Sequence, residues 1–305
     1  MAERRRVLVT GASGLVGRRL LPVLLDDDWA VRGVTRDPGR ARLPVGAEPV
    51  GWDGTRPPAA TLTGCEAVIH LAGEPVFGGP VTAARRERIL ASRVDSTRAL
   101  VDAMARLAPS ERPRTLLCAS AVGYYGSRGE EPLPESAPPG AGFLADVCVA
   151  WEAEARAATQ LGVRTASLRI GVVLAHEGGA LAPLARIFRL GLGGRIGSGA
   201  QWFPWIHADD LVSLIRAALG DARFAGAVNA VAPNPVRNQD FTRQLSRVLR
   251  RPAVLPVPAF AVRALLGEIS GELLGSRRVI PQRALDAGFA FEHERIDSAL
   301  ATELG

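Results

Sequence analysis

Lysine is absent from the 305 residues of the chain, and all 37 of its Lys and Arg residues are arginine. Arginine stays protonated in proteins, so side-chain chemistry that needs a free amine is excluded. A Schiff base, the lysine of a Walker phosphate loop and a Tyr-Lys proton-transfer pair are therefore ruled out. Glycine and proline are abundant beside arginine, which favours a genome-wide composition bias as the cause.

Cysteine is also scarce, and the three present, Cys65, Cys118 and Cys148, are far apart and include no C-x-x-C pair. An odd, dispersed set argues against a disulfide framework and against a structural zinc site. The four histidines show no metal-ligand spacing, so we expect no bound metal. Free thiols suit a reducing cytosol, and no apolar run approaches the roughly 20 residues of a membrane span. We therefore expect a cytoplasmic protein without a membrane partner.

Aromatic residues make up only 5% of the chain, although its net charge is +6. The arginines are dispersed and form neither a basic stripe nor a stacking platform, so no nucleic-acid partner is expected. The proportions of hydrophobic (47%) and charged (22%) residues are ordinary for a globular protein. The chain is long enough to bury a full core in one or two domains.

Short β-branched runs alternate with amphipathic stretches in the first half of the chain. The predicted strands are residues 7–10, 30–34, 67–71, 115–119 and 165–173, and the helices between them include residues 82–107 and 147–160. This alternation builds βαβ units, which place their strands in a parallel sheet. The sequence therefore predicts an α/β fold: a Rossmann-type doubly wound parallel sheet with a smaller C-terminal region on the substrate side.

The first predicted strand runs directly into Gly11, Gly14 and Gly17, which have the spacing G-x-x-G-x-x-G and open a helix. Glycines at these positions permit a tight turn, let backbone N–H groups approach a pyrophosphate and allow the helix to pack on its strand. Because strand, turn and helix follow in this order, the motif predicts a dinucleotide site. The cofactor-binding residues expected here are Thr10, Gly11, Ser13, Gly14, Leu15, Val16 and Gly17.

The end of the second predicted strand distinguishes between the two nicotinamide cofactors. An acidic residue there favours NAD, whereas an arginine accommodates the 2′-phosphate of NADP. Arg36 stands nearest the strand end, after Thr35, and Arg18 offers a second positive charge. Asp37 keeps NAD(H) open, but it precedes a proline and is expected to turn outward. We therefore favour NADP(H); the alternative is that Arg36 is only a solvated surface charge.

Eight short motifs along nearly the whole chain carry a resemblance to a known family. They are V-L-V-T-G-A-S-G-L-V-G at 7–17, H-L-A-G-E-P at 70–75, S-A-V-G-Y-Y-G at 120–126, V-C-V-A-W-E at 147–152, L-R-I-G-V-V-L at 168–174, R-L-G-L-G-G at 189–194, F-P-W-I-H-A-D-D at 203–210 and P-V-R-N at 235–238. With these motifs the chain resembles an extended or atypical short-chain dehydrogenase/reductase. More closely, it is similar to the epimerase-like homologues of sugar-nucleotide epimerases that carry a C-terminal domain of unknown function.

The resemblance implies further cofactor contacts and a division of the chain. Thr35 and Arg36 would hold the NADP phosphate, Asp53 would lie beside the adenine, Leu71, Ala72 and Gly73 would line the adenine and ribose side, and Arg93 and Val172 would lie near the rest of the cofactor. The expected domains are an NADP-binding Rossmann domain over 1–175 with later returns to the sheet, a mixed substrate-side region over 176–250, and a C-terminal helical domain of unknown function over 251–305.

Enzymes of the extended class use a Tyr-x-x-x-Lys pair, and this pair is missing. If Glu152 is the glutamate that follows the lysine by four, Leu144 takes the tyrosine position and Cys148 the lysine position. A shift of one residue gives Phe143 and Val147 instead. Neither alignment supplies a proton-transfer pair, so the usual mechanism is not available.

Three residues near the cofactor are candidates for catalysis in place of the pair. Ser120 ends a predicted strand, where the family has its assisting serine. Tyr124 or its neighbour Tyr125 could act as an acid, or the two could form a structural turn that packs one ring and hydrogen-bonds the other hydroxyl. Cys148 could present a thiol to the cofactor, or it could be a small core residue.

His207 is the fourth catalytic candidate, because histidine titrates near neutrality and the following Asp209 and Asp210 could orient it. The alternative is that one of these aspartates caps the helix predicted to begin at Leu211, with His207 satisfied in a turn.

Two functions follow from these observations. The first is an NADP(H)-dependent epimerase or oxidoreductase that acts on a small polar metabolite such as a nucleotide sugar. The second is a non-catalytic NADP(H)-binding sensor or interaction protein, because a fold does not imply an activity. In either case a homodimer through the helices predicted over 82–107 and 147–160 suits this fold.

Overall fold

Seven parallel strands form the central sheet of the structure, a computed structural model that describes residues 4–57, 61–77 and 82–305. The strands are β1 (Arg6–Thr10), β2 (Ala30–Thr35), β3 (Glu48–Gly51), β4 (Ala67–His70), β5 (Thr115–Ala121), β7 (Arg164–Ile170) and β11 (Gly226–Ala230). Their order is β11-β7-β5-β4-β1-β2-β3, and each neighbouring pair is parallel. The order reverses beside β1, where open α/β sheets bind ligands. The predicted doubly wound α/β fold is confirmed.

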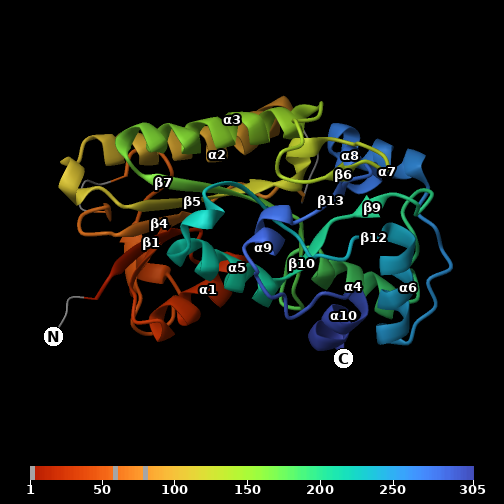
Figure 1. The fold of residues 1–305 in the computed structure, drawn as a ribbon. Helices are drawn as coiled ribbons and strands as arrows, with labels where there is room; N and C mark the ends of the chain where they lie inside the picture. Colours follow the sequence, from red (N-terminus) through yellow and green to blue (C-terminus); the bar gives the residue numbers. More distant parts are fainter. Residues whose placement is uncertain (1–3, 58–60, 78–81) are drawn as a thin grey trace.

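Helices cover both faces of this sheet (Figure 1). The two layers are α1 (Leu15–Asp26) with α5 (Ala208–Gly220), and α2 (Ala83–Ala105) with α3 (Phe143–Ala157). Successive side chains of a strand point to opposite faces, so one strand supplies both layers. In β1, Val7 and Val9 pack in the core under α1 and α5, whereas Leu8 packs in the core under α2 and α3.

The predicted helix over 147–160 begins earlier than the sequence indicated. α3 starts at Phe143, and residues 158–161 continue it as a 3-10 helix (Ala158–Leu161). The extra first turn places Leu144 on the helix, one turn before Cys148. The candidate dyad positions therefore lie on one helix face.

The predicted strand over 165–173 is interrupted at Gly171. This glycine separates β7 from β8 (Val172–Leu174), which pairs with β10 (Trp205–His207) outside the main sheet. The N–H of Gly171 binds Ala230 O at 3.0 Å, and a side chain there would meet Pro204 O at 2.9 Å. Only a glycine lets the chain leave the sheet at this point without displacing a neighbouring backbone.

The remaining elements form a smaller region at one end of the molecule (Figure 1). Its short strands are β6 (Pro132–Leu133), β9 (Trp202–Phe203), β12 (Val236–Arg237) and β13 (Arg278–Val279). Its helices are α4 (Leu181–Arg189), α6 (Asn238–Leu249), α7 (Ala259–Leu266), α8 (Ser270–Leu274) and α10 (Ile296–Leu304). The short helix α9 (Gln282–Asp286) packs instead against β11 of the main sheet. Further 3-10 turns are Pro38–Arg40, Pro109–Glu111, Val122–Tyr125, Ala222–Phe224 and Gly267–Ile269.

The proline-rich stretch over 130–142 includes β6, which pairs with β13 from the far end of the chain. The C-terminal segment is thereby joined to the loop that follows β5. Among the described residues, no helix is both long and apolar enough to cross a membrane.

Candidate cofactor and substrate site

The glycine turn after β1 has the backbone geometry that its motif predicts. Gly11 has a φ of +67°, in the left-handed region, and a side chain there would lie 2.9 Å from the carbonyl carbon of Leu71. Gly17 packs so closely on the turn that a side chain would collide with the carbonyl oxygens of Gly11 and Ala12. The turn therefore depends on glycine for its conformation at Gly11 and for helix packing at Gly17.

A cleft of about 830 Å³ opens at the carboxyl ends of β1, β2 and β4. Ten of the predicted cofactor residues line it: Thr10, Gly11, Ser13, Gly14, Thr35, Arg36, Asp53, Leu71, Ala72 and Gly73. Arg56 and Arg88 also line it, although no sequence motif pointed to them. The cleft is of the size and position of a small-molecule or cofactor site.

The other five predicted cofactor residues lie outside the lining of this cleft. Leu15 packs toward Gly178 and Gly179, and Val16 packs against the core under α1 and α5. Gly17 acts through helix packing, and Val172 packs against the core of the smaller region.

Arg93 lies behind the cleft wall. A methyl group at Gly73 would lie 3.3 Å from the Arg93 guanidinium carbon, which stands 5.2 Å from the centre of the Trp151 ring. Burial lowers the pKa of Arg93. The Arg93 side chain therefore lies against the backbone of Gly73 and does not line the cleft.

A buried hydrogen-bond chain that the sequence did not predict fixes the backbone beside the cleft. Thr10 Oγ1 accepts the N–H groups of Leu71 and Ala72, each at 3.1 Å, so its hydroxyl donates to His70 Nδ1 at 2.7 Å. His70 Nε2 then donates to Ser96 Oγ at 3.2 Å. Burial lowers the pKa of His70 to about 4, so the ring is neutral at physiological pH. His70 therefore acts as a fixed link between β1, β4 and α2.

The two charged residues after β2, Arg36 and Asp37, differ in whether they line the cleft, as the sequence analysis expected. Arg36 is exposed and lines the cleft, whereas Asp37 does not line it and lies 3.6 Å from Arg40. Asp53 lines the cleft, but its Oδ1 already accepts the Thr55 hydroxyl at 2.7 Å and the Thr55 N–H at 2.9 Å. These bonds, first that from the hydroxyl, lower the pKa of Asp53. An exposed cation and a locally satisfied carboxylate thus face the same cleft.

At the end of β5, Ser120 donates to Glu152 Oε1 at 2.7 Å. Arg169 from β7 holds the same carboxylate through both of its oxygens, each at 2.9 Å. All three residues are buried. Since the carboxylate of Glu152 only accepts, the hydroxyl hydrogen of Ser120 is committed to it, and Ser120 Oγ can only accept from a ligand.

The two adjacent tyrosines have different environments. Tyr125 accepts from Arg169 Nη1 at 2.8 Å and donates to Asn229 Oδ1 at 2.7 Å, and burial raises its pKa to about 12. Tyr125 therefore has the structural role that was the alternative for this pair. Tyr124 is only half-buried, and its ring centre lies 3.5 Å from the guanidinium carbon of Arg169.

Cys148 does not have the properties of a reactive thiol. It is buried, and burial raises its pKa to about 12, so the thiolate is not available at neutral pH. This corrects its candidacy as a catalytic thiol and favours the small core residue. The backbone of Ala121, next to Ser120, nevertheless lies close to it, so Cys148 is near the end of β5.

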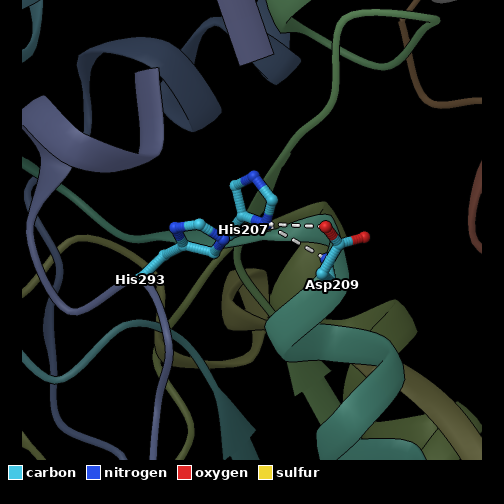
Figure 2. Close-up of side chains that lie close together, drawn as sticks. All are labelled: His207, Asp209 and His293. Carbon is cyan, nitrogen blue, oxygen red and sulfur yellow. Dashed lines mark hydrogen bonds and ion pairs between the residues drawn. The ribbon is translucent and has the colours of Figure 1, made fainter. Parts of the chain in front are cut away.

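His207 lies elsewhere, as the N-terminal cap of α5 (Figure 2). Its Nδ1 accepts the N–H of Asp209 at 3.2 Å, and its ring packs against that of His293, with 3.7 Å between centres and a tilt of 39°. His207 is fully buried, and burial followed by the charge of His293 lowers its pKa. Among the described residues, no hydrogen bond links His207, Asp209 or His293 to Ser120. The acid–base role predicted for His207 is therefore not supported.

The capping alternative for His207 also needs correction. The cap is the histidine itself rather than an aspartate. Asp210 instead accepts the backbone N–H groups of Glu292 at 2.8 Å and His293 at 3.0 Å. It joins α5 to the C-terminal segment.

His207, Asp209 and His293 lie close enough to suggest a metal site, with ligand atoms within 4.8 Å of one another. The geometry does not support one. The lone pair of His207 Nδ1 is taken by a backbone N–H, and Arg19 already pairs with Asp209 at 2.7 Å. Two imidazole ligands also point a ring nitrogen at a shared ion, whereas these rings pack against each other, with 3.7 Å between centres and a tilt of 39°. The cluster is better described as a buried polar contact between α5 and the C-terminal segment.

Comparisons with known proteins now give the family. The NAD dependent epimerase/dehydratase family matches residues 7–230, and a domain of unknown function, DUF1731, matches residues 257–303. The chain belongs to the NAD dependent epimerase/dehydratase family. It is 42% identical over 303 residues to the chloroplastic Epimerase family protein SDR39U1 homolog of Arabidopsis thaliana, covering 96% of this chain and 85% of the relative.

Two solved structures of family proteins resemble the chain over nearly its whole length. The human epimerase family protein SDR39U1, crystallised with NADPH, has a TM-score of 0.88 at 32% identity, covering 98% of this chain and 99% of that one. The nucleoside-diphosphate sugar epimerase from Corynebacterium glutamicum has a TM-score of 0.80 at 34% identity, covering 99% of this chain and 59% of that one. The resemblance to an epimerase-like family with a C-terminal domain of unknown function is thus confirmed.

Proposed function

We propose that the protein binds NADP(H) and transfers a hydride to or from a small polar metabolite, as an epimerase or an oxidoreductase. The observation that carries the proposal is the cleft, with the glycine turn at one wall and Arg36 after β2. The related human structure with NADPH supports the choice of cofactor. When bound, the nicotinamide ring supplies or accepts the hydride.

The residues present fit such a cofactor. Gly11 leaves no room for a side chain beside Leu71, so a pyrophosphate can approach the backbone and the N-terminus of α1. Arg36 would bind the 2′-phosphate with Thr35, and the chain from Thr10 through His70 holds the backbone of Leu71 and Ala72 in place.

Replacing Arg36 with alanine tests the cofactor. Isothermal titration should show that Arg36→Ala weakens NADPH binding by tenfold or more, about 1.4 kcal/mol, with little change for NADH, because only NADPH carries the 2′-phosphate. Arg40→Ala is the matched control, since Arg40 is exposed in the same segment but does not line the cleft. Equal losses for both cofactors would sink the assignment.

The name of the Corynebacterium glutamicum structure supports a nucleotide sugar as the first substrate class to test. The alternative, a non-catalytic NADP(H) sensor, rests on the missing Tyr-Lys pair. Turnover of a carbonyl or sugar probe with NADP(H) decides between them. A cytoplasmic location and a homodimer through α2 and α3 stay predictions.

A further inference from the structure

The positions of the missing pair face the end of β5 but carry no group that exchanges protons at neutral pH. Cys148 lies close to the backbone of Ala121. A methyl group at Gly123 would lie 3.6 Å from Leu144 Cβ. Leu144 and Cys148, rather than Phe143 and Val147, therefore stand where the pair belongs.

A carboxylate from the C-terminal segment lies beside these same positions. The methyl group imagined at Gly123 would also lie 3.6 Å from both carboxylate oxygens of Glu272, in α8. The charge of Glu272 also raises the pKa of Cys148, after burial and the charge of Glu152. Glu272 is thus adjacent to the site of the missing pair, although it belongs to the segment that matches the domain of unknown function.

A buried arginine holds one oxygen of this carboxylate. Arg277 Nη2 donates to Glu272 Oε1 at 2.7 Å, and Arg277 Nε donates to Gly126 O at 2.7 Å. Arg277 is 4% exposed, whereas the side chain of Glu272 is 20% exposed. No described residue forms a hydrogen bond with Glu272 Oε2. Oε1 of Glu272 is therefore held by Arg277, which in turn binds the loop after Ser120. Oε2 can meet a ligand.

Ser120 is unsuited to the proton transfer that the reaction requires. Its hydrogen is committed to Glu152, and the carboxylate of Glu152 is held through both oxygens by Arg169. Tyr125 is likewise committed to Asn229. Of the described side chains named around the end of β5, Tyr124 and Glu272 keep a polar atom without a hydrogen bond to another described residue.

We propose that Glu272 is the general acid–base of this protein, in place of the Tyr-Lys pair. The inference rests on the proposed function and assigns the proton transfer within it. In the oxidative direction, Glu272 Oε2 accepts the hydroxyl proton of the substrate, and the C–O bond of the substrate alcohol becomes C=O. The hydride, with its electron pair, leaves the same carbon for the nicotinamide. In the reductive direction the protonated carboxyl returns that proton to the carbonyl oxygen. The substrate class is an alcohol or its carbonyl, as in a sugar ring.

Turnover with named probes tests the role. UDP-glucose with NADP⁺, and glyceraldehyde and dihydroxyacetone with NADPH, are offered to the full chain and to Glu272→Gln, Glu272→Asp and Tyr124→Phe. Glutamine keeps an oxygen for Arg277 but cannot exchange the proton. We expect Glu272→Gln to lower kcat by about 100-fold or more, with an unchanged NADPH Kd, and Glu272→Asp to keep part of the rate. The control, Glu294→Gln, changes an exposed carboxylate of the same segment and should match the wild type.

A second measurement does not depend on finding a substrate. Carbodiimide and glycinamide label accessible carboxylates, and mass spectrometry reads each site with and without NADPH. We expect NADPH to protect Glu272 but not Glu294. Missing protection would overturn the inference, and so would turnover that survives Glu272→Gln. A loss in Tyr124→Phe alone would assign the proton to Tyr124. Protection without turnover of any probe would instead contradict the proposed hydride transfer.

Discussion

Arg169 organises the polar groups at the end of β5, although the sequence analysis did not select it. It binds Glu152 through two hydrogen bonds and Tyr125 through a third, while its guanidinium lies over the Tyr124 ring. Burial disfavours its charge, but the bonds to Glu152 raise its pKa. A charged residue inside an apolar strand was a usable signal, because a buried charge must be paired.

Single residues show what sequence reasoning could reach. Arg36 was predicted from its place after a strand, because the motif fixes the chain locally. His70 was missed, because its partners Thr10 and Ser96 lie 60 and 26 residues away and meet it only in the fold.

The two tyrosines give a residue-scale prediction. Tyr125→Phe leaves a buried N–H of Arg169 and the buried Oδ1 of Asn229 without this partner, so the free energy of unfolding should fall by about 1–3 kcal/mol. Tyr124→Phe keeps the ring over Arg169 and should change it by less than about 0.5 kcal/mol. Urea denaturation measures both, and equal losses would contradict the roles assigned here.

At the scale of elements, Arg19 joins the first helix of the nucleotide-binding part to three other segments. From α1 it binds Glu177 after β8, Asp209 in α5 and Glu303 in α10. These contacts were not predictable, because the sequence pattern identified α1 by its apolar face and gave no partner for its polar one. The last helix is thus tied to the helix that follows the glycine turn.

This contact predicts a pH dependence of stability. A hydrogen bond from Arg19 lowers the pKa of Glu177 from 4.5 to about 2 in the folded chain. Because the folded-state pKa is the lower one, the stabilisation is complete above about pH 4.5 and is lost as the pH falls toward 2. Because Glu177 is exposed and solvent screens its pair with Arg19, Glu177→Gln should cost about 1 kcal/mol or less at pH 7 and progressively less across that window. Chemical denaturation from pH 3 to 7 measures this; a pH-independent difference would contradict it, and Glu294→Gln is the exposed control.

The packing of the whole molecule follows neither the predicted regions nor the boundary between the two family matches, 7–230 and 257–303. β11 and α5 lie within the predicted substrate-side region over 176–250. They nevertheless complete the main sheet and the core between the sheet and α1. The core of the smaller region combines Trp205 and Phe241 with Ile296 and Leu300 of α10. The alternation of strands and helices predicted the sheet, because the hydrophobic periodicity that marks each strand and helix is a local property of the sequence. It could not show which later segments return to the sheet, since that depends on long-range packing.

Shared cores predict that the chain unfolds as one unit. Residues 257–303 supply α10 to a core whose other walls are α4 and α6, and Asp210 of α5 binds the backbone of the same segment. Neither part keeps its apolar surface buried without the other, so calorimetry should give one transition with equal calorimetric and van't Hoff enthalpies. With the proposed NADPH site, NADPH should move that whole transition to higher temperature, because a ligand that binds only the folded chain stabilises it. Two transitions, of which NADPH shifts only one, would show that the segments fold independently.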